Sequence, residues 1–173
     1  GLVPPEGLRF HIREAVEVAG AERIGHGVAI MHEEDAEGLL AAMAERGVLV
    51  EVPLSSNDII LGIRGEDHPL RTYLRRGVPV ALATDDEGVA RSEMTMEFLK
   101  GVREQRLDYP TLKRMVRNSL EYPRHFRPIR PCWGGEEADF AAAACQGEVA
   151  RSPRASLQRI LELELEAFEA RYR

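Results

Sequence analysis

The most informative segment of the sequence is Val78-Pro79-Val80-Ala81-Leu82-Ala83-Thr84-Asp85-Asp86-Glu87-Gly88. Its apolar first half is typical of a short strand that is buried on both faces, as in a parallel sheet. The two carboxylates therefore stand where the strand ends and a loop begins. One aspartate at such a point commonly caps the next helix, but two beside a core strand also suit a metal or a ligand. Because successive strand residues point to opposite faces, we expect Asp85 and Asp86 to have different tasks.

Two similar units precede this strand, each with an amphipathic helix that ends at a glycine. We expect strands over 22–26, 48–52 and 78–83, and helices over 8–19, 32–46, 67–76, 92–105, 109–122, 136–147 and 153–173. Consecutive units of this kind predict an α/β fold with a parallel sheet and right-handed crossovers.

Polar residues gather at the carboxyl end of each predicted strand. The histidine of Gly25-His26-Gly27 follows the first, Ser55-Ser56-Asn57 follows the second after Pro53, and Asp85 and Asp86 follow the third. Ligands bind at this edge both in barrels and in open α/β sheets. Glycines on both sides of His26 allow a sharp turn and a close approach to the imidazole. The serine–asparagine cluster taken alone is equally consistent with turn chemistry.

The composition is that of one domain over residues 1–173, with a proline- and arginine-rich segment over 123–135 expected to be irregular. The formal net charge of −6 disfavours nucleic acid, and no apolar run is long enough for a membrane span. Cys132 and Cys145 lack CxxC spacing, which predicts reduced thiols. With no signal-peptide pattern at the N-terminus, the expected location is the cytoplasm.

Helix ends and faces give two further expectations. Ser92 is expected to cap the helix that follows it. In the last helix, the apolar residues are expected to form the buried stripe, and the glutamates and arginines the solvated face. That stripe consists of Leu157, Ile160, Leu161, Leu165 and Phe168.

Several motifs together resemble the C-terminal portion of the adenosine deaminase family of metal-dependent hydrolases, whose fold is a (β/α)8 barrel. The matching segments are Arg23–Gly27, Glu51–Asn57, His68–Pro69, Gly77–Val80, Thr84–Asp86 and Asn118–Tyr122. Val52 stands where the family often has cysteine, and Pro123–Pro131 departs from the family's apolar pattern. The resemblance implies a partial barrel, strands six to eight with their helices, followed by C-terminal helices.

The resemblance also implies roles for three residues in the hydrolytic deamination of adenosine or a related 6-aminopurine. Asp85 would be the aspartate ligand of a catalytic zinc ion. His26 would orient or deprotonate the zinc-bound water, and the two groups would titrate together. Asp86 would hydrogen-bond a nitrogen of the purine's imidazole ring. Zinc lowers the pKa of bound water to about 7, which provides hydroxide for attack on the amino-bearing carbon.

The family's other site residues are missing. None of the five histidines lies in an HxH pair, and the histidine and glutamate of the family's fifth strand have no counterpart. Catalytic zinc sites use about three protein ligands, and a barrel has eight strands where we count three. We therefore expect the chain alone to be inactive.

Three hypotheses remain open at this point. The first is a zinc-dependent aminohydrolase, or a piece of one, acting on a purine nucleoside. The second is a non-catalytic partial barrel that needs a complementary fragment or associates with itself, because exposed strand edges promote pairing. The third is an unrelated α/β protein that binds magnesium through Asp85 and Asp86. The third lacks a phosphate-binding glycine loop and leaves Gly25-His26-Gly27 unexplained.

Overall fold

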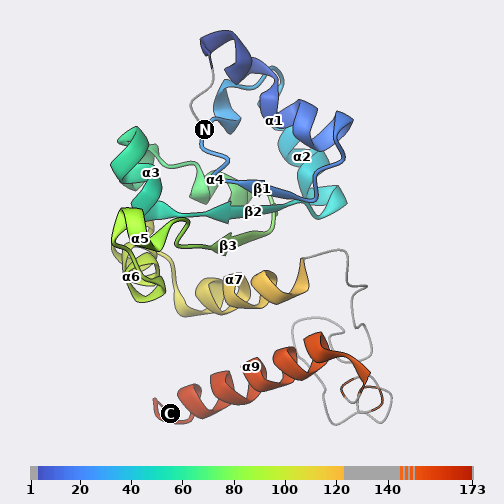
Figure 1. Cartoon of the computed structure of the whole chain (residues 1–173), viewed down its shortest axis with the longest axis vertical. Coiled ribbons are helices and arrows are strands. Elements are labelled where there is room, and N and C mark those ends of the chain that lie inside the picture. The colour runs from blue at the N-terminus through green and yellow to red at the C-terminus, as the bar shows by residue number, and fades with distance from the viewer. Residues whose placement is uncertain (1–3, 123–144, 146, 148, 150, 173) are drawn as a thin grey trace. The chain divides into compact units, whose positions relative to one another are not determined.

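The computed structural model describes residues 4–122, 145, 147, 149 and 151–172, which belong to two compact units over 1–122 and 123–173. Each unit is described by itself (Figure 1). The expected irregular segment over 123–135 lies outside the described residues. So does the expected helix over 136–147, except for Cys145 and Gly147, which are helical. The single domain over 1–173 stays a prediction.

The first unit alternates short strands with helices, as the sequence predicts. Its elements are η1 (Pro5–Arg9), α1 (His11–Arg13), η2 (Glu14–Val18), β1 (Arg23–Gly25), η3 (Ile30–His32), α2 (Ala36–Arg46), β2 (Leu49–Val52), α3 (Leu54–Leu61), η4 (Gly65–Asp67), α4 (Leu70–Arg75), β3 (Val80–Leu82), α5 (Glu87–Ala90), α6 (Met94–Gln105) and α7 (Tyr109–Glu121). The three predicted strands are all present, each shorter than predicted.

The strands form a parallel sheet in the order β1-β2-β3, which confirms the predicted sheet (Figure 1). Glu51 of the central strand lies opposite Gly25 on one side and Ala81 on the other. The ladder continues past β1, where the His26 N–H donates to the Glu51 carbonyl at 2.8 Å. The register therefore brings the carboxyl ends of the strands to one edge.

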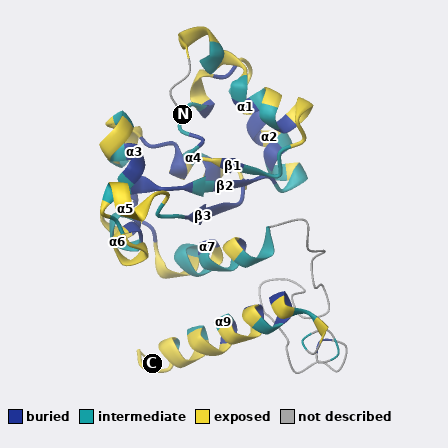
Figure 2. Ribbon diagram, viewed as in Figure 1, coloured by how far each residue is buried: buried dark blue, intermediate teal, exposed yellow. Residues whose placement is uncertain are grey.

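The sheet is the centre of the core, and Figure 2 shows its strands largely buried between helices. Leu39, Leu40 and Met43 of α2 are fully buried in the same cluster as Val50 and other strand residues. Parallel strands that are covered on both faces need such continuous apolar packing. The predicted apolar face of the helix is confirmed at these positions.

Helix α7 packs against β3, the last strand of the sheet. Met115 of α7 is buried in the core. The Asn118 side-chain amide donates to the Val80 carbonyl at 2.8 Å, and this asparagine is buried too. A buried backbone carbonyl on the outer strand thereby obtains a hydrogen-bond partner.

A buried tyrosine holds the turn that carries His26. The Tyr73 hydroxyl donates to the Gly27 carbonyl at 2.7 Å, and burial raises the pKa of this phenol. Gly27 has φ +62°, and a Cβ atom built there would lie 2.7 Å from the Tyr73 hydroxyl oxygen and 2.9 Å from a methyl carbon of Val50. Only glycine adopts this left-handed backbone without strain and leaves room for the Tyr73 and Val50 side chains.

The turn alternative for the serine–asparagine cluster does not hold, because Leu54 begins helix α3 directly after Pro53. The expected cap at Ser92 is wrong. Ser92 does not cap α6; its hydroxyl donates instead to the Thr84 carbonyl at 3.2 Å. In both cases a hydrogen bond with a residue outside the segment outweighs the local preference.

The second unit contains α9 (Pro153–Glu169), which Ser152 caps by accepting from the Ala155 N–H at 3.3 Å. The predicted buried stripe is wrong at three of its five residues, and the other two, Leu161 and Leu165, are only half-buried. Leu157, Ile160 and Phe168 are exposed, whereas the buried residues of α9 are Arg154, Ala155, Gln158 and Glu162. The periodicity fixes a helix with two faces, but which face is buried depends on residues outside the helix.

Cys145 is buried and disulfide-bonded, so the expectation of two reduced thiols is wrong. Spacing alone could not show this, because a disulfide depends on distance in space.

No helix in the described part of the chain is long and apolar enough to cross a membrane.

We predict that Gly27→Ala lowers the free energy of unfolding by about 2–4 kcal/mol, from left-handed backbone strain and overpacking against Tyr73 and Val50. Gly20→Ala is the matched control, because Gly20 has φ +68° but nothing within 4 Å of the added Cβ. The control should cost only about 1–2 kcal/mol, the strain alone. Urea denaturation measures both variants, and equal losses would contradict the packing argument.

Candidate active site

His26 and Asp85 meet at the carboxyl edge of the sheet. Each follows its strand and has a left-handed backbone, with φ 64° for His26 and 58° for Asp85. His26 Nε2 lies 3.5 Å from Asp85 Oδ2, and the side chains are 28% and 39% exposed. Left-handed non-glycine residues are uncommon and cluster at functional sites. The two residues singled out from the sequence therefore share one partly open site.

The first turn of α3 connects these two residues. The Ser56 hydroxyl donates to Asp85 Oδ2 at 2.8 Å, and Asn57 Oδ1 lies 2.6 Å from His26 Nδ1. Both connecting residues are buried. Because α3 begins directly at the end of the central strand, it extends toward the ends of both outer strands. The partners of His26 and Asp85 thus come from a single helical turn.

A second histidine lies behind the asparagine. His68 Nε2 is 2.8 Å from Asn57 Nδ2, and the Leu70 N–H donates to His68 Nδ1 at 3.1 Å. Burial, with a smaller contribution from the charge of His26, lowers the pKa of His68 from 6.5 to about 4. His68 is therefore a neutral imidazole at physiological pH.

A buried carboxylate holds α3 in place. Glu97 of α6 is fully buried, and the Ser55 N–H donates to its two oxygens at 3.2 and 3.3 Å. A carboxylate at a helix N-terminus satisfies free N–H groups and interacts favourably with the helix dipole. Glu97 thus fixes the turn that presents Ser56 and Asn57, although it contacts neither His26 nor Asp85 in a hydrogen bond.

Asp86 has a different surrounding from Asp85. Its side chain is exposed and caps the short helix α5 by accepting from the Val89 N–H at 3.3 Å. The helix-cap interpretation of the acidic pair therefore holds for Asp86, and the two aspartates do separate tasks. Its substrate-binding role stays a prediction.

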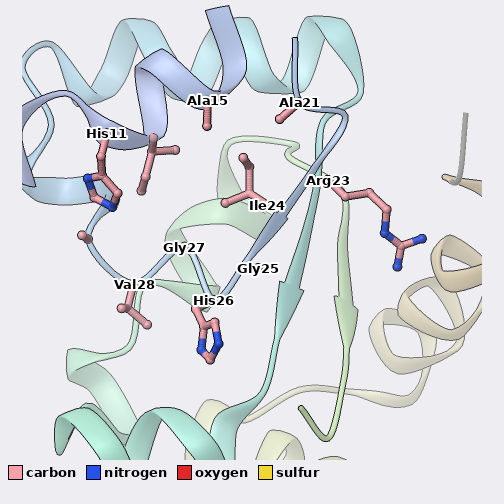
Figure 3. A pocket seen from close by; sticks show the side chains of 11 residues that line it. His11, Ala15, Ala21, Arg23, Ile24, Gly25, His26, Gly27 and Val28 are labelled. Carbon is pink, nitrogen blue, oxygen red and sulfur yellow. The ribbon is translucent and has the colours of Figure 1, made fainter. Parts of the chain in front are cut away.

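A cavity of about 270 Å³ lies beside β1 (Figure 3). It is lined by α1, η2 and the segment around β1, including His11, Ile12, Ala15, Ile24 and His26. None of its lining residues comes from β2 or β3. The cavity therefore adjoins the side of β1 that faces away from the rest of the sheet.

The donor set fits one side of a zinc site. A carboxylate oxygen and an imidazole nitrogen are ligand types that zinc accepts, and Ser56 holds the carboxylate as an outer-shell partner does. Among the described residues, however, no three His, Cys, Asp or Glu side chains are grouped to hold a metal ion. These residues can supply part of a catalytic zinc site but not all of it.

Sequence reasoning did not assign roles to four residues of this site: Ser56, Asn57, His68 and Glu97. Ser56 and Asn57 were visible as a polar pair directly after a strand, although their helix was not. His68 lies next to Pro69 in a segment otherwise expected to begin a helix. Glu97 gave no signal, because its partner Ser55 is far away in sequence.

We predict that His68 makes the chain less stable as the pH falls from about 6.5 to about 4. The unfolded state takes up a proton in this window and the folded state does not, so the unfolding free energy should decrease, by roughly 2–4 kcal/mol. His68→Gln should remove this component. Urea denaturation of both proteins across this pH window separates the contribution of His68 from that of the carboxylates, which titrate in both. If the unfolding free energy falls equally with pH in the two proteins, the prediction is wrong.

Comparison with known proteins shows which family the chain belongs to. Residues 6–124 match the sequence profile of adenosine deaminases. An adenosine deaminase of Clostridium perfringens is 36% identical over 116 residues, 66% of this chain and 34% of the relative. An aminodeoxyfutalosine deaminase of Streptomyces coelicolor is 33% identical over 109 residues, 62% of this chain and 27% of the relative. The chain thus spans about a third of the length of the relatives it matches.

Solved structures agree on the fold. An adenine deaminase from Arthrobacter aurescens has a TM-score of 0.59 at 23% identity, over 72% of this chain and 36% of that one. An amidohydrolase from Burkholderia ambifaria, with bound zinc, has a TM-score of 0.57 at 21% identity, over 90% of this chain and 38% of that one. These neighbours are (β/α)8 barrels, so the described sheet is part of one. The chain belongs to the adenosine deaminase family, as its sequence motifs predicted.

Proposed function

We propose that the chain forms one side of the active site of a zinc-dependent aminohydrolase. The reaction is hydrolytic deamination of adenosine or a related 6-aminopurine, with release of ammonia. The observation that carries this proposal is the meeting of His26 and Asp85, 3.5 Å apart, at the carboxyl edge of a sheet within the matched residues 6–124. The names of the sequence relatives, adenosine deaminase and aminodeoxyfutalosine deaminase, support the reaction class.

Each site residue has a part in this proposal. Asp85 binds the zinc ion, and the Ser56 hydroxyl orients its carboxylate through the 2.8 Å hydrogen bond. His26 faces the same space and hydrogen-bonds the water that reacts. Asp86 binds a nitrogen of the purine's imidazole ring. Zinc, when bound, supplies a hydroxide nucleophile near neutral pH.

The 173 residues alone are expected to be inactive under this proposal. Asp85 is the one zinc ligand proposed among the described residues, whereas catalytic zinc sites use about three protein ligands. The remaining ligands and the proton-transferring group are proposed to come from sequence outside the described residues.

A chimera tests the proposed reaction. Residues 6–124 replace the matching segment of the Clostridium perfringens adenosine deaminase, which supplies the rest of a barrel. We predict that the chimera retains zinc and consumes adenosine, measured by the loss of its ultraviolet absorbance. A folded, zinc-containing chimera that leaves adenosine and other 6-aminopurines intact would contradict the proposal.

Graded variants of the chimera test the separate roles. Asp85→Asn should reduce zinc affinity by more than about 100-fold, and Ser56→Ala by about 10–100-fold, because an outer-shell partner matters less than a ligand. Asp86→Asn should lower kcat/KM for adenosine and leave the zinc content unchanged. Equal zinc affinity in Asp85→Asn and the parent would remove Asp85 from the metal site.

The alternative is a non-catalytic partial barrel that binds a complementary fragment. Two observations favour it. Among the described residues, β1 and β3 each have one strand neighbour, and the cavity of about 270 Å³ adjoins the outer side of β1. Size-exclusion chromatography of the chain mixed with the first five strands of a relative tests complex formation. A stable complex without deaminase activity would favour this alternative over the first.

A further inference from the structure

A set of polar contacts runs from the backbone through His68 and Asn57 to His26, whose ring in turn lies beside Asp85. It begins at the Leu70 N–H, 3.1 Å from His68 Nδ1, and continues from His68 Nε2 to the Asn57 amide at 2.8 Å. The other end of that amide lies 2.6 Å from His26 Nδ1, and His26 Nε2 lies 3.5 Å from Asp85 Oδ2. Each contact needs one donor and one acceptor.

The backbone end of this set fixes the hydrogen on His68. A backbone N–H can only donate, so His68 Nδ1 must accept and carries no hydrogen. A neutral imidazole has one N–H, which is then on Nε2. His68 is 3% exposed, and its pKa of about 4 keeps it neutral. His68 Nε2 therefore donates to Asn57.

The asparagine must then accept from His68 and donate to His26. If its NH2 group faced His68, the contact would join two donors, unless His68 carried no hydrogen at all. Rotating the amide by 180° about its last bond keeps both contact distances, because the oxygen and nitrogen have nearly the same shape. The oxygen then accepts from His68 Nε2, and the NH2 group donates to His26 Nδ1.

We propose that Asn57 and His68 are positioning residues that hold the neutral ring of His26 in the tautomer with its hydrogen on Nε2. Because Nδ1 accepts from the asparagine, the only remaining N–H of His26 points toward Asp85. His26 thus presents a hydrogen-bond donor to the site and not a base. This meaning for catalysis rests on the proposed function: His26 orients the reacting water, and another group removes its proton.

Nitrogen-15 NMR of the full chain with labelled histidine tests the tautomer directly. Long-range proton–nitrogen correlations at about pH 8 show which ring nitrogen carries the hydrogen in each neutral imidazole. His26→Gln and His68→Gln assign the signals by deleting them. We predict the Nε2–H tautomer for both residues. An Nδ1–H tautomer of His26 in the unmodified chain would overturn the proposal, and this outcome depends on no variant.

Asn57→Asp separates positioning from general structural support. The carboxylate still accepts from His68 Nε2 but cannot donate to His26 Nδ1, so His26 should gain a hydrogen on Nδ1 while the His68 signals keep their pattern. Ser56→Ala, one residue earlier on α3, is the matched control and should leave both tautomers unchanged. If His26 keeps Nδ1 free of hydrogen in Asn57→Asp, the proposal is wrong. The readout needs neither zinc nor turnover, so it can fail or hold independently of the proposed function.

Discussion

The parallel pairing of both outer strands with β2 is the constraint on which the site depends. With Glu51 level with Gly25 and Ala81, the chain leaves all three strands at the same edge, and His26, Ser56 and Asp85 follow within a few residues. A shift of one residue in β2 would turn its side chains to the other faces and separate Ser56 and Asn57 from their partners. Apolar burial of the strands therefore determines the spacing of the polar site.

Groups that never touch the proposed reactants hold this edge in one arrangement. Glu97 fixes the first turn of α3 through the Ser55 N–H, and Tyr73 fixes the turn after His26 through the Gly27 carbonyl. All of these contacts are partly or fully buried, where a polar group without a partner costs about 1–3 kcal/mol. Each side chain therefore has few alternative positions, as expected for a site that orients its reacting groups in advance.

The sequence predicted the sheet and the two main site residues because both depend on local pattern. Apolar runs mark buried strands, and His26 and Asp85 lie one and three residues past the ends of two of them. Helix α3 was missed because Pro53 and two serines resemble a turn, while the Glu97 carboxylate that caps this helix comes from far along the chain. The roles of Asn57 and His68 depend on which group donates, and that follows only from three-dimensional contacts. The buried face of α9 was wrong for a related reason, since it is set by residues outside the helix.

In the proposed function, these residues form one side of a zinc site and need further ligands to complete it. The zinc content of the purified 173-residue chain, measured together with the absorbance of added adenosine, tests this claim most directly. We predict far less than one zinc per chain and no loss of adenosine, because Asp85 is the single zinc ligand proposed among the described residues, where no three His, Cys, Asp or Glu side chains are grouped to hold a metal ion. About one tightly held zinc per chain with turnover of adenosine would contradict it, since about three protein ligands would then have to be present in this chain.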